Sequence, residues 1–409
     1  MLRRFWKSQE GNFAAILAIA SLPTMAAVGG AIDVVTTYTK ASRLQNALDA
    51  SALAIGTKYY PGMPAEEMNQ VGRELFAANL FGLSEDIDET DPLADTVSKF
   101  KVDVPVGAND TIDVSSTIFN PSFMRGPFTW NAHRSSSVRV MPGSPACVMA
   151  LNPSASAAVK LQGSTQVALN GCVIAANSKA SDSVSRGGSA QVAAECVVTV
   201  GKTSGLSGSS SKLACGAPLE QQFASLDPLL NVTPPNDGCN KTVPNGNNAK
   251  TLTPGTYCGQ NFSGNITLQP GVYVLRGGEV KLNGNGSLVG HGVTIFLLEG
   301  ASFSITANQL VDLSPPTSGP YAGITIYQAR DNPQKLTING TSGSKVSGFV
   351  YAPKAQIFFA GNSTASASAC LRLVGDTIEM TGNSAIESDC KSQLGGREML
   401  AGRHVALVK

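Results

Sequence analysis

The sequence is poor in charge and in the residues on which most catalytic and metal sites depend. Charged residues make up 14% of the chain, against roughly a quarter in ordinary soluble domains, and the net charge is +1. A near-neutral chain has no basis for binding nucleic acid through a basic surface. The only histidines are His133, His291 and His404, and there is no Cys-x-x-Cys and no Cys/His cluster with zinc-ligand spacing. The G-x-S-x-G, P-loop and H-E-x-x-H motifs are also missing. We therefore expect no enzyme, no cofactor, no metal site and no small-molecule substrate.

Cysteine is absent before residue 147, and all eight cysteines follow. An even number of cysteines in an exported chain favours disulfides. The candidates are Cys147, Cys172, Cys196, Cys215, Cys239, Cys258, Cys370 and Cys390. Pairing in sequence order would close four short loops, each worth about 3 kcal/mol in the chain-entropy picture. Because eight cysteines allow 105 arrangements, the sequence leaves the connectivity open.

Charge is missing again from residues 11–32, which follow a short basic lead with Arg3, Arg4 and Lys7. An apolar run of about twenty residues is long enough to cross a bilayer whose core is roughly 30 Å thick. Basic residues before the run, with no such cluster directly after it, favour a cytoplasmic N-terminus and an exported body. The sequence therefore predicts a single-pass anchor in the inner membrane of a bacterium, with most of the chain periplasmic or extracellular.

Three residues within this run concern its packing. Pro23 is tolerable because a membrane helix can re-satisfy the carbonyl that a proline frees. Gly29 and Gly30 would let another helix approach closely. A secretory signal peptide cleaved near Ala27 is the alternative interpretation.

The residues that follow favour the uncleaved anchor. Leu44, Leu48, Ser51 and Ile55 recur at i, i+4, i+7 and i+11, which is one stripe of a helix. We count Leu44, Leu48 and Leu53 as packing residues of a helix that leaves the membrane and continues outside it. A cleaved leader has no need of such a continuation.

The same segment resembles the N-terminal part of the TadE/TadG-like family, membrane-anchored proteins associated with assembly of the tight-adherence (Flp) pilus in bacteria. The resemblance implies a non-enzymatic role in an envelope pilus or secretion apparatus, with other pilus or secretion-platform proteins as partners. It rests on these runs: Gly11-Asn12-Phe13-Ala14, Pro23, Gly30-Ala31-Ile32-Asp33, Tyr38, and Arg43-Leu44-Gln45-Asn46-Ala47-Leu48-Asp49-Ala50-Ser51-Ala52-Leu53-Ala54.

Residues 61–145 read as a small α+β segment. A helix is expected after Pro64, and alternating strands at 100–104, 111–115 and 137–140. The acidic run at 85–91 lacks the glycine and glutamate of a calcium loop, so a solvated loop is favoured. The run from Asp113 to Thr117 comes near a D-x-S-x-S metal motif, but strand alternation explains it better.

Beyond residue 145 the sequence becomes repetitive. An apolar residue, a spacer, then Gly followed by Asn, Ser or Thr recurs, as at Gly163, Gly264, Gly340, Gly361 and Gly382, and the last three are spaced by 21 residues twice running. Such a period is typical of a solenoid. Short runs that alternate at period two, separated by Gly, Asn and Pro, give three strands per period. We therefore predict an all-β right-handed parallel β-helix, a three-sided solenoid, and this region also resembles the exported portion of many anchored relatives of the pilus family.

These observations divide the chain into four expected parts: a transmembrane anchor and long helix at 1–60, the small α+β segment at 61–145, the parallel β-helix at 146–395 and a terminal strand or tail at 396–409. The expected function is that of a membrane-anchored accessory protein of Flp pilus assembly that presents a rigid β-solenoid. Two alternatives stay open. One is a glycan- or surface-binding adhesin using Tyr321, Tyr327, Tyr351 or Phe358, and the other is a polysaccharide-acting enzyme, suggested by Gly290-His291-Gly292 alone.

Overall fold

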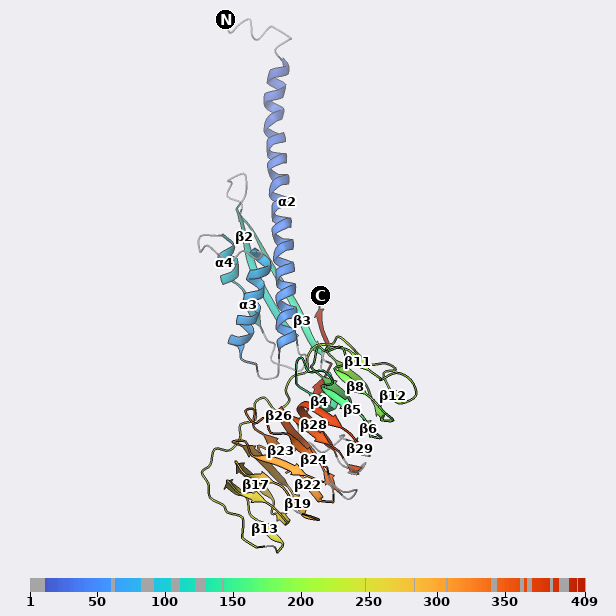
Figure 1. Ribbon diagram of the computed structural model, residues 1–409. Coiled ribbons are helices and arrows are strands. Elements are labelled where there is room, and N and C mark those ends of the chain that lie inside the picture. The colour runs from blue at the N-terminus through green and yellow to red at the C-terminus, as the bar shows by residue number, and fades with distance from the viewer. Residues whose placement is uncertain are drawn as a thin grey trace. The chain divides into compact units, whose positions relative to one another are not determined.

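The computed structural model places two compact units, one formed by Met1–Met141 with His404–Lys409 and the other by Pro142–Arg403. We call them unit 1 and unit 2. The described residues are 12–59, 63–81, 92–103, 111–121, 129–141, 143–246, 248–282, 284–306, 308–339, 344–360, 364–365, 370–382, 385–389, 397–402 and 404–408. The expected long apolar helix and the β-rich region with parallel sheets are both present (Figure 1).

In its described residues, unit 1 combines three helices with a four-stranded antiparallel sheet. The helices are α2 (Asn12–Lys58), α3 (Ala65–Phe81) and α4 (Pro92–Ser98). The sheet has the order β1 (Lys101–Asp103), β2 (Thr111–Pro121), β3 (Thr129–Met141) and β31 (His404–Val408). Strand β31 pairs with β3 from Ser137 to Met141. The sheet is therefore built from three strands that precede unit 2 in the sequence and one that follows it.

The second half of α2 lies between α3 and the sheet, and two glycines allow the close approach. A Cβ on Gly72 of α3 would lie 2.6 Å from Cδ1 of Ile55, and one on Gly56 would lie 2.7 Å from Cγ1 of Val405. Ser51, itself fully buried, donates a hydrogen bond to the carbonyl of Gly72 at 2.9 Å. The core of unit 1 is thus organised on α2.

Unit 2 contains parallel strands stacked in long ladders. Ladder A has, in spatial order, β14 (Gly255–Cys258), β17 (Gly271–Arg276), β20 (Val293–Leu298), β23 (Ile324–Gln328), β26 (Gly348–Phe359), β28 (Leu371–Met380), β4 (Ser144–Ala150), β7 (Val173–Ala176) and β10 (Val197–Thr199). Ladder B has β15 (Asn261–Phe262), β18 (Glu279–Val280), β21 (Ser302–Ile305), β24 (Leu336–Ile338), the second halves of β26 and β28, β5 (Val159–Leu161), β8 (Val184–Arg186) and β11 (Thr203–Ser204). Since β26 and β28 belong to both, the two ladders lie in one sheet, which has 17 strands when β30 (Leu400–Ala401) is included.

Ladder C consists of two five-stranded parallel sheets. The first has β13 (Lys250–Leu252), β16 (Asn265–Leu268), β19 (Ser287–His291), β22 (Leu310–Ser314) and β25 (Lys345–Val346). The second has β27 (Thr364–Ala365), β29 (Ala385–Asp389), β6 (Gln166–Asn170), β9 (Gln191–Ala194) and β12 (Ser211–Leu213). A short strand, β30 (Leu400–Ala401), pairs antiparallel with the start of β4.

The strands of unit 2 do not stack in the order of the chain. From β4 the chain proceeds to β7 and β10 at one end of ladder A, then crosses to β14 at the other end and returns strand by strand to β28. There β28 pairs with β4, with Leu373 opposite Val148. The crossing is made by an extended segment, residues 216–238, which we call the strap.

Buried side chains distinguish ladder A from ladder B. In β21 of ladder B, Phe303 and Ile305 are buried while Ser302 and Ser304 are half-buried, so one face lies in the core. In β20 of ladder A every residue is buried, from Val293 to Leu298. One core cluster draws on all three ladders, and a second cluster, which includes Phe296, Tyr327 and Leu229 of the strap, lies on the other face of ladder A.

Two of the recurring glycines, Gly163 and Gly382, stack at one corner together with Gly188, while Gly340 and Gly361 lie outside the described residues. Gly163 has a φ of +72°, and a Cβ there would lie 3.0 Å from the backbone nitrogen of Gly382 in the adjoining repeat. A Cβ on Gly188, at a φ of +63°, would lie 3.0 Å from the carbonyl oxygen of Gly163. A left-handed backbone with this close approach requires glycine at this corner. An added Cβ on Gly264 would meet nothing within 4 Å, although its backbone is also left-handed, with a φ of +81°.

Candidate functional site

The first half of α2 carries a row of exposed apolar side chains. Those more than a third exposed are Ile16, Leu17, Ile19, Leu22, Met25, Val28, Ile32, Val34, Val35 and Tyr38. The described part of this helix is long and apolar enough to cross a membrane. A stretch of this kind leaves apolar surface in water unless lipid or another protein covers it. The feature fits a single-pass membrane protein, while the basic lead at Arg3, Arg4 and Lys7 lies outside the described residues.

The six residues assigned to anchor packing divide between the two halves of α2. Leu44 and Leu48 are fully buried in unit 1, and Leu53 packs against the same cluster. Pro23 is exposed within the first half of the helix. Gly29 is buried, and an added Cβ on Gly30 would have nothing within 4 Å among the described residues.

Disulfides occupy unit 2 as the cysteine spacing suggested. The pairs Cys147–Cys172, Cys196–Cys215 and Cys239–Cys258 are formed, with Cα–Cα distances of 5.7, 5.4 and 5.7 Å. Cys370 is also disulfide-bonded, and Cys390 lies outside the described residues. Three of the four pairs expected from sequence order are therefore present.

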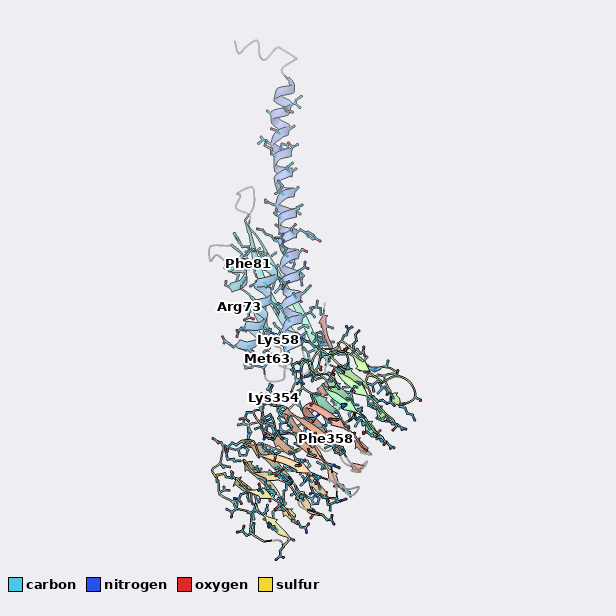
Figure 2. All side chains as sticks on the ribbon, in the orientation of Figure 1. Lys58, Met63, Arg73, Phe81, Lys354 and Phe358 are labelled. Atoms are coloured by element: carbon cyan, nitrogen blue, oxygen red, sulfur yellow. A yellow bond between two sulfur atoms is a disulfide. The ribbon has the colours of Figure 1, made fainter. Side chains whose placement is uncertain are left out.

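The aromatic residues proposed for glycan binding have different surroundings. Tyr327 and Tyr351 are buried, with their rings stacked at 4.7 Å, so neither offers a surface. Tyr321 is half-buried and packs edge-on against Phe296. Phe358, which Figure 2 labels, is half-buried and faces outward in ladder B. The ammonium of Lys335 lies 3.7 Å from its ring centroid.

A polar cluster lies beside Phe358 on the same face of ladder B. Glu379 is directly opposite Phe358 in the pairing of β26 with β28. Its carboxylate accepts hydrogen bonds from Gln162 at 3.0 Å and Gln356 at 3.1 Å, and Lys160 is 3.4 Å away. An aromatic ring beside a fixed carboxylate and two amides forms the most ligand-like outward surface among the described residues of ladder B.

His291, at the Gly-His-Gly corner, is exposed at the end of β19. Its Nδ1 is 3.1 Å from Oγ of Ser314, and its Nε2 is 3.9 Å from Oδ2 of Asp312. These three side chains are cross-strand neighbours on ladder C, in water. In unit 1, β2 runs unbroken through Asp113, as strand alternation predicted. Among the described residues no group of three His, Cys, Asp or Glu could hold a metal ion, and the acidic run at 85–91 lies outside them.

A charged cluster that the sequence did not indicate ties the strap to ladder A. Arg330 donates to Asp227 at 2.5 Å and to the carbonyl of Leu229 at 2.9 Å. Tyr351 donates to the same carboxylate at 2.8 Å. Burial, with the nearby Asp227 charge, raises the pKa of Tyr351, while the ion pair with Asp227 raises the pKa of Arg330 against the opposing effect of burial. A hundred or more residues separate Asp227 from these partners in the chain, so no local pattern could have revealed the cluster.

Arg372 differs from Arg330 although both lie along ladder A. It is only 5% exposed, and its Nε and Nη1 have no hydrogen-bond partner among the described residues. The Phe349 ring lies 5.8 Å from its guanidinium carbon. Burial lowers the pKa of Arg372 to about 10, with the charge of Glu398 acting in the opposite direction.

Comparison with known proteins concerns the N-terminal helix. The family described as Flp pilus-assembly TadE/G-like matches residues 11–56, which coincide with α2 up to its last turn. No curated protein and no solved structure matches the chain significantly. The match covers both the exposed apolar half of α2 and the half that organises unit 1. The N-terminal segment of this chain is therefore similar to the TadE/G-like family, and the helix that it forms is long and apolar enough to cross a membrane.

Proposed function

We propose that this protein is a non-enzymatic, membrane-anchored accessory protein of Flp pilus assembly, which presents a rigid β-solenoid outside the cytoplasm. The observation that carries the proposal is the TadE/G-like match on a helix whose first half is apolar and exposed. The first half of α2 crosses the inner membrane with its N-terminus in the cytoplasm, and its second half is the base of unit 1. Partners are other pilus or secretion-platform proteins.

The three ladders of unit 2 are, in this proposal, the three sides of a right-handed parallel β-helix. Two observations support it. Along ladders A and B, and within each sheet of ladder C, spatial neighbours are mostly three strands apart in the chain, as in β14, β17 and β20. Inward side chains from all three ladders also meet in one core, including Phe262, Leu288 and Ile295. In such a stack each coil pairs with the coils on either side of it, so the stack resists bending. This rigidity suits a spacer.

A scaffolding role is favoured over catalysis by the surroundings of the titratable groups. His291 is in water, and the arginine–carboxylate pair of Arg330 and Asp227 fastens the strap. A general acid or base needs a position within hydrogen-bond reach of a bound substrate, usually in a water-excluding cleft. We therefore assign these groups to structure.

The experiment is localisation combined with pilus assembly in cells that carry the pilus system. The full chain should fractionate with the inner membrane, and unit 2 should be digested when protease is added to spheroplasts. A deletion strain should lose pili and regain them with the full chain, but not with a chain lacking residues 12–32. Protection of unit 2 in intact spheroplasts would contradict the orientation, and normal pili in the deletion strain would contradict the role.

A second candidate function is glycan binding on ladder B, favoured by the surface that Phe358 forms with Glu379, Gln162 and Gln356. Phe358→Ala should abolish binding on a glycan array if this surface is a site. Phe223→Ala is the matched control, because Phe223 is 51% exposed on the strap, away from the cluster. Absence of binding by the wild-type protein across the array would eliminate this candidate.

A further inference from the structure

The strap crosses the outer face of ladder A from one end to the other. It starts beside β10, where the backbone N–H of Leu219 donates to the carbonyl of Val197 at 2.8 Å. Two residues past its end, the backbone N–H of Asn240 donates to the carbonyl of Thr256 in β14 at 3.0 Å. In between, Ser225 exchanges two hydrogen bonds with Asn177, which follows β7. The strap therefore spans the whole stack.

Between its ends the strap is held mostly by side chains of ladder A that bind its carbonyl oxygens. Arg330 donates to the carbonyl of Leu229, and Tyr327 to that of Val232 at 3.2 Å. Tyr321 donates to Thr233 at 3.1 Å. Leu229 is the one large apolar side chain of the strap that is fully buried.

The face beneath the strap is aromatic. Phe296 packs against Tyr321 at 4.8 Å and against Tyr327 at 5.2 Å, and Tyr327 stacks on Tyr351. These rings come from successive strands of ladder A or the turn before them, so they form a continuous row. Such a row would be a large apolar patch in water without its cover.

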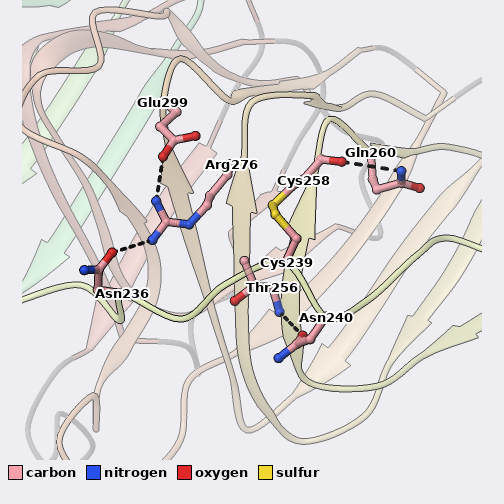
Figure 3. Close-up of a disulfide and its surroundings, with 8 residues drawn as sticks. All are labelled: Asn236, Cys239, Asn240, Thr256, Cys258, Gln260, Arg276 and Glu299. Carbon is pink, nitrogen blue, oxygen red and sulfur yellow. Dashed lines mark hydrogen bonds and ion pairs between the residues drawn. A yellow bond between two sulfur atoms is a disulfide. The ribbon is translucent and has the colours of Figure 1, made fainter.

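A disulfide fastens each end of the strap. Cys215, directly before it, is bonded to Cys196 at the start of β10, and Cys239, directly after it, is bonded to Cys258 at the end of β14. Figure 3 shows the second disulfide with two neighbouring hydrogen bonds, one from the backbone N–H of Thr256 to Oδ1 of Asn240 and one from Nη2 of Arg276 to Oδ1 of Asn236. The third disulfide, Cys147–Cys172, joins β4 to the residue before β7 and touches neither end of the strap.

We infer that the strap is a lid latched by these two disulfides, and that the aromatic face of ladder A is covered only once both have formed. Each latch closes when two thiols lose two protons and two electrons to a disulfide oxidant by thiol–disulfide exchange, and a dithiol reductant reverses the reaction. In the reduced chain the strap would be held on ladder A only by one buried leucine, the Asp227 cluster and a few hydrogen bonds. The lid would therefore close in an oxidising compartment, which fits the proposed export but does not depend on it, because the latch can be tested on purified protein.

The test compares the full chain, purified in detergent, with a variant lacking both latches, Cys196→Ser, Cys215→Ser, Cys239→Ser and Cys258→Ser. Amide hydrogen exchange at residues 226–234 should become at least about tenfold faster, because the two ends of the strap would lose their covalent attachment to ladder A and the open form would be more populated. Binding of the apolar dye ANS should rise as the aromatic row is uncovered. The matched control, Cys147→Ser with Cys172→Ser, should leave both readouts at the wild-type level.

Variants that cut one latch each keep the test decisive if the quadruple variant does not fold. Removing Cys196–Cys215 should loosen residues 219–226 first, and removing Cys239–Cys258 should loosen residues 233–240 first. Wild-type exchange across the strap in both, with the β-sheet signal of circular dichroism retained, would overturn the inference. Equal loosening in the Cys147–Cys172 control would overturn it as well, because the effect would then be a general loss of stability.

Discussion

At the residue scale, Gly163 and Gly187 differ in whether the surrounding structure leaves room for a side chain. Gly163 is left-handed, and an added Cβ would meet the backbone of Gly382, whereas one on Gly187 would meet nothing within 4 Å. We expect Gly163→Ala to lower the free energy of unfolding of unit 2 by about 2 kcal/mol, since a left-handed backbone is strained for any residue with a Cβ. Urea unfolding followed by circular dichroism measures it. Gly187→Ala is the control and should change stability by less than about 0.5 kcal/mol; equal losses would contradict the corner geometry.

The same substitution should have opposite effects on stability at two arginines, Arg372 in β28 and Arg330 just after β23. Arg372→Met removes a buried cation with unpartnered nitrogens, so we expect stability to be unchanged or raised by about 1 to 3 kcal/mol. Arg330→Met leaves the carboxylate of Asp227 without its cation, so we expect a loss of about 3 kcal/mol. Thermal unfolding of both variants in the same buffer makes the comparison. A loss for Arg372→Met as large as that for Arg330→Met would contradict the prediction that the buried Arg372 cation is not compensated by the charge of Glu398.

Buried tyrosines make unit 2 sensitive to alkali. Burial raises the pKa of Tyr257, Tyr273, Tyr321, Tyr327 and Tyr351 above the ordinary value of about 10. The folded state thus holds these phenols neutral. Their ionisation does not affect the free energy of unfolding below pH 10, but above pH 10 the phenols ionise first in the unfolded chain, so the free energy of unfolding falls as pH rises. We expect unfolding of unit 2 to coincide with the appearance of phenolate absorbance above pH 10. Phenols that ionise near pH 10 while the sheet signal persists would contradict their burial.

At the scale of elements, α2 has two halves with different surroundings. Leu48 is fully buried in unit 1 and Val35 is 63% exposed. We expect Leu48→Ala to destabilise unit 1 by about 2 to 5 kcal/mol, because it leaves a cavity, and Val35→Ala to have little effect. Hydrogen exchange of the α3 amides in the full chain reports on unit 1 alone. Equal protection of α3 in the two variants would contradict the packing of α2 on α3.

The sequence predicted α2 and the alternating strands of ladder B better than it predicted ladder A. The stripe Leu44, Leu48, Ser51 and Ile55 is buried as expected, because a helix face is a local pattern. Ladder A does not alternate, since the strap and neighbouring residues cover its second face. The unbroken apolar run from Ile295 to Leu298 was the available signal, because a strand buried on both faces is typically apolar throughout. Tyr327 and Tyr351 were considered for a surface and lie under the strap for the same reason.

At the scale of the whole molecule, the order of the strands could not be predicted. The repeat period and the corner glycines are local, and they were read correctly as short strands between turns. That β28 joins β4, and that the strap returns the chain to β14, depends on pairings between distant segments that leave no periodic trace. The charged cluster around Asp227 was missed because it exists only in this arrangement.

Unit 1 depends on residues that follow unit 2 in the chain. A chain ending at Arg403 lacks β31, which covers five residues of β3 and places Val405 against Gly56 and Val138. We expect the β3 amides to exchange much faster in this variant, because an uncovered strand edge is no longer hydrogen-bonded. The control is Leu407→Ser, a change at a residue that is 40% exposed. Unchanged protection of β3 after truncation would contradict the pairing.

The place of β31 sets an order on biogenesis. Every strand of unit 2 must be synthesised before β31, which pairs with β3 in the sheet of unit 1, exists. Until then the edge of β3 that β31 covers stays without its partner strand. A chain interrupted anywhere in unit 2 would therefore have an incomplete sheet in unit 1, and a protease could attack the chain at that open edge even if the strands of unit 2 had formed.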